Sequence, residues 1–138
     1  MILSRPLQAV VVDASAMIEV LGGDERWTAQ MEQWHGTGAL LLAPSHFPIE
    51  MANALMYGVR LPAADVISRL QQLFAAGIDL VDRGLVGLYD AVELAGRHRL
   101  TIYDAAYLSL VLDVDGELAT NDEALIRAAK AEDVTVVV

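Results

Sequence analysis

The sequence contains no cysteine, which excludes disulfide bonds, thiolate nucleophiles and zinc or iron–sulfur sites built on cysteine. Basic residues are also scarce: nine lysines and arginines stand against 19 aspartates and glutamates, a net charge of −10. Because nucleic acids are usually bound by a basic face, this balance argues against binding through diffuse charge. Long apolar runs are missing too, since the run 9–12 stops at Asp13 and a membrane span needs roughly 20 residues. With no secretory signal at its start, the chain is expected in the reducing cytoplasm.

The 138 residues are 55% apolar, which suffices for the core of one domain of this length. No internal repeat, low-complexity tract or linker composition interrupts the chain. We therefore expect a single domain over residues 1–138.

Short apolar runs alternate with helical patterns along the chain. The expected strands are 8–13, 39–43, 78–82, 117–120 and 134–138, and the first of them has the pattern of a fully buried strand in a parallel sheet. The expected helices are 14–21, 24–34, 47–60, 62–77, 85–99, 101–112 and 122–131. Alternating strands and helices imply right-handed crossovers. The predicted class is α/β, a three-layer α/β/α fold with a central, mainly parallel sheet of four to five strands.

Four acidic residues stand at or near the carboxyl ends of these strands, where open α/β sheets bind ligands. Asp13 and Asp122 each follow a strand, Glu50 lies early in the helix after the second strand, and Asp104 begins the helix before the fourth. If these segments converge, the carboxylates cannot all stay ionised without a cation. Hard oxygen ligands favour Mg²⁺ or Mn²⁺.

Each acid also has a purely structural interpretation. Asp13 and Asp122 could cap the helices that follow them, Asp104 could interact with a helix dipole, and Glu50 could simply face solvent. No single acid decides between the two interpretations. The set at one end of the sheet favours the functional one.

Three polar residues could support this cluster. Asn53 lies one turn after Glu50 and could orient its carboxylate, or it could belong to an exposed stripe. Ser15 and Thr120 place hydroxyl groups near the acids, either to fix their orientation or for local capping. Tyr103 and Tyr107 are expected in the core or at the rim, with base stacking as a lesser alternative.

These residues together resemble a known family. The segments Val-Val-Asp-Ala-Ser-Ala around Asp13, Glu50 with Asn53, Ile-Tyr-Asp-Ala-Ala-Tyr-Leu around Asp104, and Leu-Ala-Thr-Asn-Asp ending at Asp122 resemble the PIN domain, and more narrowly the VapC-type toxins. The resemblance spans nearly the whole chain in the right order. Residues 54–100 and the second predicted helix carry no matching motif.

The resemblance implies an activity, a cofactor and a partner. Asp13, Glu50, Asp104 and Asp122 would be the metal-binding acids, supported by Ser15, Asn53 and Thr120. The family consists of Mg²⁺- or Mn²⁺-dependent endoribonucleases that cut structured RNA such as transfer or ribosomal RNA and are neutralised by a small antitoxin. The cation would activate a water for in-line attack and make an acidic cleft attractive to phosphate. Arg97 and Arg99, with His98 between them, could lie on the RNA rim or simply end a helix.

Two other functions compete with this one. A phosphoaspartyl protein, either a receiver domain or a haloacid-dehalogenase-like hydrolase, would use Asp13 as a nucleophile. Such proteins need a lysine after a later strand, yet Lys130 is the only lysine and lies near the end of the last helix; the hydrolase also needs an acid where Ser15 stands. The other alternative is a catalytically inactive PIN-like binding module.

The apolar content also suggests protein partners. We expect a homodimer that in addition holds an antitoxin segment against residues 27–60. The large apolar residues that suggest this surface, with core packing as the alternative for most of them, are Trp27, Trp34, Phe47, Met51, Leu55 and Met56.

Overall fold

A computed structural model describes residues 8–138 and contains one five-stranded sheet. Its strands are β1 (Ala9–Val12), β2 (Leu40–Pro44), β3 (Ile78–Val81), β4 (Glu117–Ala119) and β5 (Val136–Val137). They are ordered β3-β2-β1-β4-β5, and every neighbouring pair is parallel. The α/β class and the parallel sheet predicted from the sequence are confirmed. Because β1 is the central strand, residues Val10 to Val12 are fully buried.

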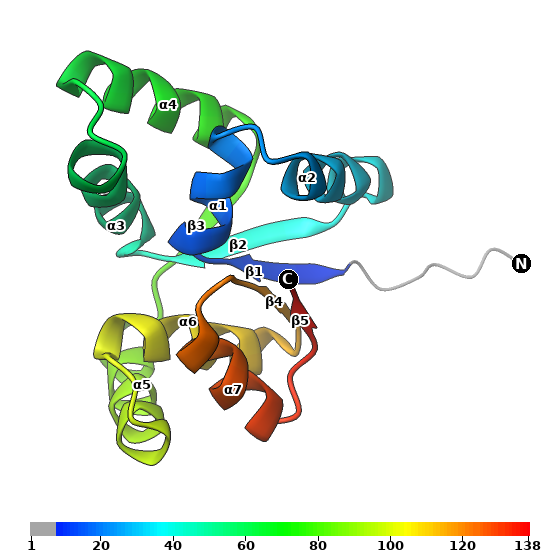
Figure 1. Cartoon of the computed structure of the whole chain (residues 1–138). Coiled ribbons are helices and arrows are strands. Elements are labelled where there is room, and N and C mark those ends of the chain that lie inside the picture. Colours follow the sequence, from blue (N-terminus) through cyan, green and yellow to red (C-terminus); the bar gives the residue numbers. More distant parts are fainter. Residues whose placement is uncertain (1–7) are drawn as a thin grey trace, which may run out of the picture.

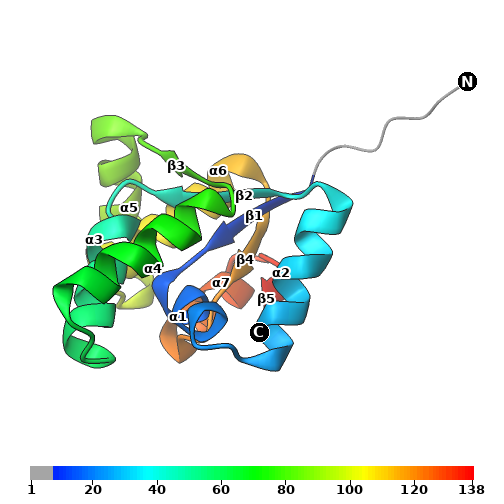
Figure 2. The same cartoon turned by 90° about the horizontal axis from the view of Figure 1, so that it is seen from above.

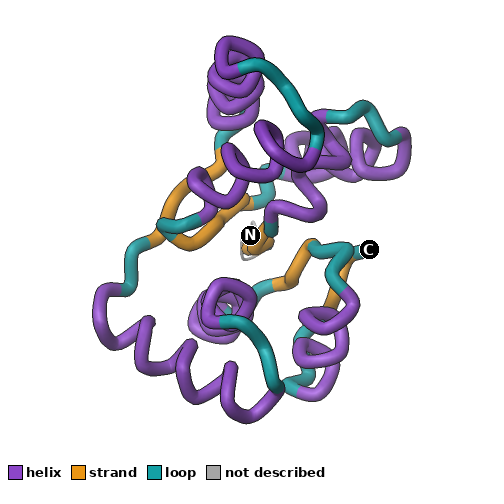
Figure 3. Tube along the Cα trace, turned by 60° about the vertical axis from the view of Figure 1, so that its left-hand side comes forward, coloured by secondary structure: helices purple, strands orange, loops and turns teal. Residues whose placement is uncertain are grey.

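The helices form one layer on each face of the sheet (Figure 1). The first layer holds α1 (Ala14–Leu21), α2 (Glu25–Thr37), α3 (Phe47–Asn53) and α4 (Ala63–Ala75). The second holds α5 (Gly84–His98), α6 (Ile102–Val114) and α7 (Glu123–Ala131). The tube in Figure 3 shows the same separation from another side. Figure 2 looks down on the first layer, where the chain leaves β1 directly into α1.

The helix expected over 47–60 is not continuous. It consists of α3 followed by a π-helical turn, η1 (Ala54–Gly58), and the chain then turns at Arg60, whose φ is +67°. A π-turn widens the helix by one residue, which changes the face that the following side chains present. Two other bounds shift by a turn or less: α2 runs to Thr37 instead of residue 34, and α6 to Val114 instead of 112.

The large apolar residues of the first helical layer belong to the core. Trp27, Trp34, Phe47, Met51 and Leu55 are at most 2% exposed, and Met56 is partly buried against them. For these residues the structural alternative was right, and they cannot form the surface that binds a partner. Exposed apolar side chains occur elsewhere, among them five on α5 and Ile49 and Tyr57 on and after α3. In residues 8–138 no helix is long and apolar enough to cross a membrane.

Candidate active site

Asp13 stands where the central strand β1 ends and α1 begins. Its side chain caps α1 by accepting a hydrogen bond from the Ala16 N–H at Oδ1, 3.0 Å away. The Ser15 hydroxyl donates to the same oxygen at 2.7 Å, and the Thr120 hydroxyl donates to Oδ2. Asp13 is therefore both a helix cap and a buried carboxylate held on both oxygens, with only 3% of its surface exposed.

Burial raises the pKa of Asp13 to about 6, because the charged carboxylate has lost most of its contact with water. The three hydrogen bonds oppose this rise since they stabilise the anion, while the nearby charge of Glu50 adds to it. A carboxyl group in this balance takes up a proton more readily than an exposed aspartate, unless a cation stabilises its charge.

Thr120 and Ser15 connect Asp13 to the loop after β4. Thr120 is fully buried at the end of β4, and its Oγ1 also accepts a hydrogen bond from the Asp122 N–H at 3.0 Å. The Ser15 Oγ accepts one from the Asn121 N–H at 2.9 Å. Because β1 and β4 are neighbours in the sheet, these bonds fix the two acid-bearing loops relative to each other.

Glu50 lies in the first turn of α3, which follows β2 on the other side of β1. Its side chain is about one third exposed (34%), and one carboxylate oxygen is 3.3 Å from Nε2 of His46. The charge of Glu50 raises the pKa of both Asp13 and Asp104. Glu50 therefore faces the same space as those two acids.

Asp104 and Asp122 approach from the second helical layer. Asp104 is in the first turn of α6, where its N–H donates to the Thr101 hydroxyl at 3.1 Å. Asp122 caps α7 by accepting from the Leu125 N–H at 2.8 Å. Partial burial, then the charge of Asp122, then that of Glu50 raise the pKa of Asp104. The structure thus places all four predicted acids at the carboxyl edge of the sheet.

The chemistry of these four side chains suits a divalent cation. As the side chains stand, no three acidic or histidine residues among 8–138 are close enough to hold one ion directly. Mg²⁺ normally keeps several of its water molecules and takes only one or two carboxylates as direct ligands. Burial raises the pKa values of Asp13 and Asp104, and the charges of neighbouring acids raise them further. Such a loose group of carboxylates fits that ion.

Three predicted site residues do not join the cluster through direct contacts. Asn53 is exposed at the end of α3 and makes no hydrogen bond to Glu50. Arg97 makes a two-pronged contact with Glu132, at 3.0 and 3.1 Å, which directs its guanidinium toward the end of α7. Arg99 follows α5 in a left-handed conformation and is exposed.

His46 is a component of the site that sequence reasoning missed. Its ring contacts Glu50 and packs against Tyr103 and Tyr107 of α6, with ring centroids 5.6 and 5.0 Å apart. The only sequence signal was its spacing, four residues before Glu50, which places both side chains on one side of a helix start. Tyr107 lies in the core and the exposed Tyr103 at the rim, as expected.

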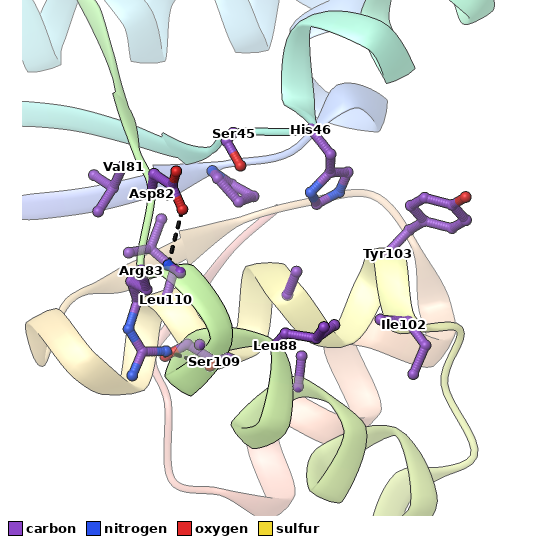
Figure 4. Close-up of a pocket in the computed structure, with 15 residues that line it drawn as sticks. Ser45, His46, Val81, Asp82, Arg83, Leu88, Ile102, Tyr103, Ser109 and Leu110 are labelled. Atoms are coloured by element: carbon purple, nitrogen blue, oxygen red, sulfur yellow. Dashed lines mark hydrogen bonds between the residues drawn. The ribbon is translucent and has the colours of Figure 1, made fainter.

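A cavity of about 240 Å³ opens beside the acids, between β2, β3 and helices α5 and α6 (Figure 4). His46 and Tyr103 lie at one end of it, and Asp82 and Arg83 at the other. Arg83 is anchored there by Ser109, Asp90 and Asp113, so its charge is already neutralised. The rest of the lining is mostly apolar, which suits an apolar group better than an ion.

The geometry argues against the phosphoaspartyl alternative. A nucleophilic aspartate must present a free oxygen to its substrate, but both oxygens of Asp13 accept hydrogen bonds and the residue is buried. Lys130 lies in the last turn of α7, at the opposite end of that helix from its acidic cap Asp122. No lysine is therefore placed to neutralise a phosphoryl group on Asp13.

Comparison with known proteins agrees with this arrangement. Residues 10–131 match the family model described as PIN domain. The chain is 33% identical over 129 residues to Ribonuclease VapC3 of Mycobacterium tuberculosis, which covers 91% of this chain and 90% of that protein. PAE2754 from Pyrobaculum aerophilum has a similar structure, with a TM-score of 0.68 and 24% identity over 96% of this chain and 92% of that one.

Two further solved structures share the fold. One is VapC20 of Mycobacterium tuberculosis, described as a Sarcin-Ricin loop cleaving toxin, with a TM-score of 0.69 and 15% identity over 86% of this chain and 94% of that one. The other is VapBC2 from Rickettsia felis bound to a promoter DNA fragment, with a TM-score of 0.71 and 13% identity over 94% and 98%. At these identities the likeness concerns the fold alone.

Proposed function

Since this chain belongs to the PIN-domain family and, within it, to the VapC group, we propose that it is a Mg²⁺- or Mn²⁺-dependent endoribonuclease and the toxin of a type II toxin–antitoxin pair. The observation that carries the proposal is that four acids, Asp13, Glu50, Asp104 and Asp122, stand at the carboxyl edge of the sheet, where the charges of Glu50 and Asp122 act on their neighbours. The similarity to Ribonuclease VapC3 supports RNA as the substrate. We place the protein in the cytoplasm, with transfer or ribosomal RNA as the substrate class.

In the proposed mechanism the acids bind the cation and the hydroxyl groups hold the acids in place. A divalent cation at this site would supply the charge that activates water and stabilises the departing oxygen of a phosphodiester. Thr120 and Ser15 keep the Asp13 carboxylate oriented by donating to its two oxygens. His46 lies 3.3 Å from the Glu50 carboxylate and borders the same space.

The test combines cleavage, binding and growth. Purified protein is expected to cut RNA only with added Mg²⁺ or Mn²⁺, and Mn²⁺ should raise its melting temperature because it relieves the repulsion between acids. Asp13→Asn should abolish cleavage and the toxicity seen when the protein is expressed alone. Asp24→Asn changes another helix-capping aspartate, on α2, and should leave both intact.

Two results would contradict the proposal. Equal toxicity of the wild type and Asp13→Asn would exclude metal-dependent cleavage as its cause. Absence of any thermal shift at millimolar Mn²⁺ would remove the metal site, and with it the reason for RNA to approach so acidic a protein. An inactive binding module would show the thermal shift without cleavage.

The proposed homodimer uses the exposed apolar side of α5. Five residues of this helix are 45% to 67% exposed: Leu85, Val86, Leu88, Tyr89 and Val92. A monomer seldom leaves so continuous an apolar patch in water, and a two-fold dimer buries the same patch on both copies. Val86→Asp should convert the dimer to a monomer in sedimentation experiments. Ile67→Asp, at a 56% exposed position on α4, is the matched control that should remain dimeric.

The antitoxin is proposed to bind around α3 and η1, within the expected region 27–60. Ile49 and Tyr57 are the most exposed apolar residues there, at 76% and 72%. Tyr57→Asp should weaken copurification with the cognate antitoxin without changing the oligomeric state. An unchanged complex would remove this surface from the proposal.

A further inference from the structure

A second hollow, of about 500 Å³, lies between the end of α5 and the outer side of α7, and the proposed mechanism does not use it. Its lining has four basic residues and two alanines, and consists of Arg97, His98, Arg99, Arg127, Ala128 and Ala131. Helices α5 and α7 lie on the same face of the sheet (Figure 1). We call this feature the basic hollow.

Two of the four basic side chains in the basic hollow already have a partner. Arg97 and His98 both contact Glu132, the latter at 2.8 Å, and these contacts lower the pKa of the Glu132 carboxyl. Arg99 and Arg127 have no carboxylate within 4 Å among the described residues. Their two charges are therefore available to an anion.

The concentration of positive charge here is unusual for this chain. Four of its nine basic residues lie at the end of α5 or on α7: Arg97, Arg99, Arg127 and Lys130. The overall charge is −10, yet the lining of the basic hollow includes no acidic residue. The two alanines of the lining are small, and the planar forks of the guanidinium groups match phosphate oxygens.

The basic hollow lies toward the end of α7, where Arg97 and His98 contact Glu132, whereas Asp122 caps the start of that helix. Arg99 is two residues before Thr101, the cap of α6 that binds the Asp104 backbone. Arg127 lies five residues after Asp122 on α7, a rise of about 7.5 Å. An RNA strand whose reacting phosphate is at the acids would thus carry a neighbouring phosphate past the basic hollow.

We propose that the basic hollow is a phosphate-binding subsite for the RNA backbone, with Arg99 and Arg127 as its contacts. This inference rests on the proposed ribonuclease function and assigns part of its substrate binding. The subsite explains how an acidic protein retains RNA beyond the one phosphate at its cation. It also assigns Arg97 a positioning role, since its guanidinium is held by Glu132.

The test measures the affinity for unfractionated bacterial transfer RNA over a range of KCl concentrations, in an Asp13→Asn background with Mg²⁺ so that the RNA stays intact. Losing one phosphate contact should lower affinity about fivefold at 0.1 M salt and reduce the slope of log K against log salt by about 0.7 to 0.9. We expect this for Arg127→Gln and for Arg99→Gly. Arg26→Gln, an exposed arginine on α2 in the other helical layer, is the control that should change neither.

Arg99→Gly separates binding from folding. Arg99 has a φ of +57°, a conformation that glycine adopts without strain, so this variant should fold at least as stably as the wild type. Weaker RNA binding by a protein of undiminished stability would support the subsite. An unchanged affinity and slope in the double variant, which combines Arg99→Gly with Arg127→Gln, would overturn it, as would an Asp13→Asn background that binds no RNA at any salt.

Two further arms distinguish other outcomes. If the double variant loses binding to poly-glutamate and keeps its affinity for RNA, the proposal is overturned and the basic hollow belongs to an acidic protein segment. RNA cleavage by the otherwise wild-type protein with Mn²⁺ is measured separately. If the otherwise wild-type protein cleaves RNA but the double variant binds RNA with unchanged affinity, the subsite alone is refuted. If the double variant binds RNA more weakly but the otherwise wild-type protein does not cleave RNA, the ribonuclease function is refuted and a phosphate-binding surface remains.

Discussion

Replacing Asp13 by asparagine should stabilise the metal-free protein at neutral and alkaline pH. The unfolded chain releases the Asp13 proton near the ordinary value of 3.8, but burial raises the pKa in the folded protein to about 6. The folded state therefore binds more protons between these values, so wild-type stability falls as the pH rises from about 4 to 6 and then stays reduced. Below pH 4 the carboxyl is neutral in both states and this loss is absent.

The size of the effect follows from the shift. A difference of about two units corresponds to about 3 kcal/mol of unfolding free energy at pH 8. Asparagine keeps an oxygen for the Ala16 N–H but fits the Thr120 hydroxyl less well, which costs about 1 kcal/mol. The net gain of about 2 kcal/mol should move the urea midpoint up by about 1 M, for a slope of about 2 kcal/mol/M.

The assay is urea unfolding in EDTA at pH 8 and at pH 4, with the wild type, Asp13→Asn and Asp24→Asn. Asp13→Asn should unfold at higher urea than the wild type at pH 8 and lose this advantage at pH 4. Asp24→Asn alters a helix cap outside the site and should not be stabilising. A lower midpoint for Asp13→Asn at pH 8 would refute the reasoning, because it would mean that the hydrogen bonds outweigh the burial of charge.

Three further changes test the scaffold of the site by urea unfolding at pH 8. Thr120→Val removes the donor to Asp13 and should cost about 1 to 3 kcal/mol, while Thr120→Ser should cost less; equal losses would contradict a role for the hydroxyl. Gly116→Ala places a Cβ 2.6 Å from the backbone oxygen of Ala9 and should cost about 1 to 3 kcal/mol, and an unaffected midpoint would refute that contact. Arg83→Lys keeps the charge but loses the fork that joins α5 to α6, so a loss of about 1 to 2 kcal/mol is expected, and no loss would make the network dispensable.

Much of the fold could be predicted because parallel sheets have a simple sequence pattern. The run of valines before Asp13 marks a strand buried on both faces, and its carboxyl end is where α/β folds place polar groups. Trp27, Met31 and Trp34 show why the surface prediction failed. They are spaced at i, i+4 and i+7, the pattern of one buried helix face, so periodicity could have placed them in the core.

The rest depends on contacts that no local pattern contains. His46 belongs to the site because Tyr103 and Tyr107, nearly 60 residues later in the sequence, pack against its ring. The π-turn after Asn53 adds one residue to a helix that otherwise looks continuous. The partner of Arg97 is Glu132 on another helix, so spacing alone could not show that its charge is already neutralised.

The environment of Asp13 balances two requirements of a cation site. Burial without hydrogen bonds would keep the carboxyl group protonated at neutral pH. A carboxylate that is fully hydrogen-bonded in water would already be stable as an anion and would gain little from a cation. With a pKa of about 6, the carboxylate outnumbers the acid about thirty to one at pH 7.5, yet each anion retains the unfavourable energy of its burial. A cation that relieves this energy is bound more tightly than by exposed acids, because the free site is the less stable state. In the proposed metal-dependent function, the same burial that lowers the stability of the metal-free protein would contribute to its affinity for metal.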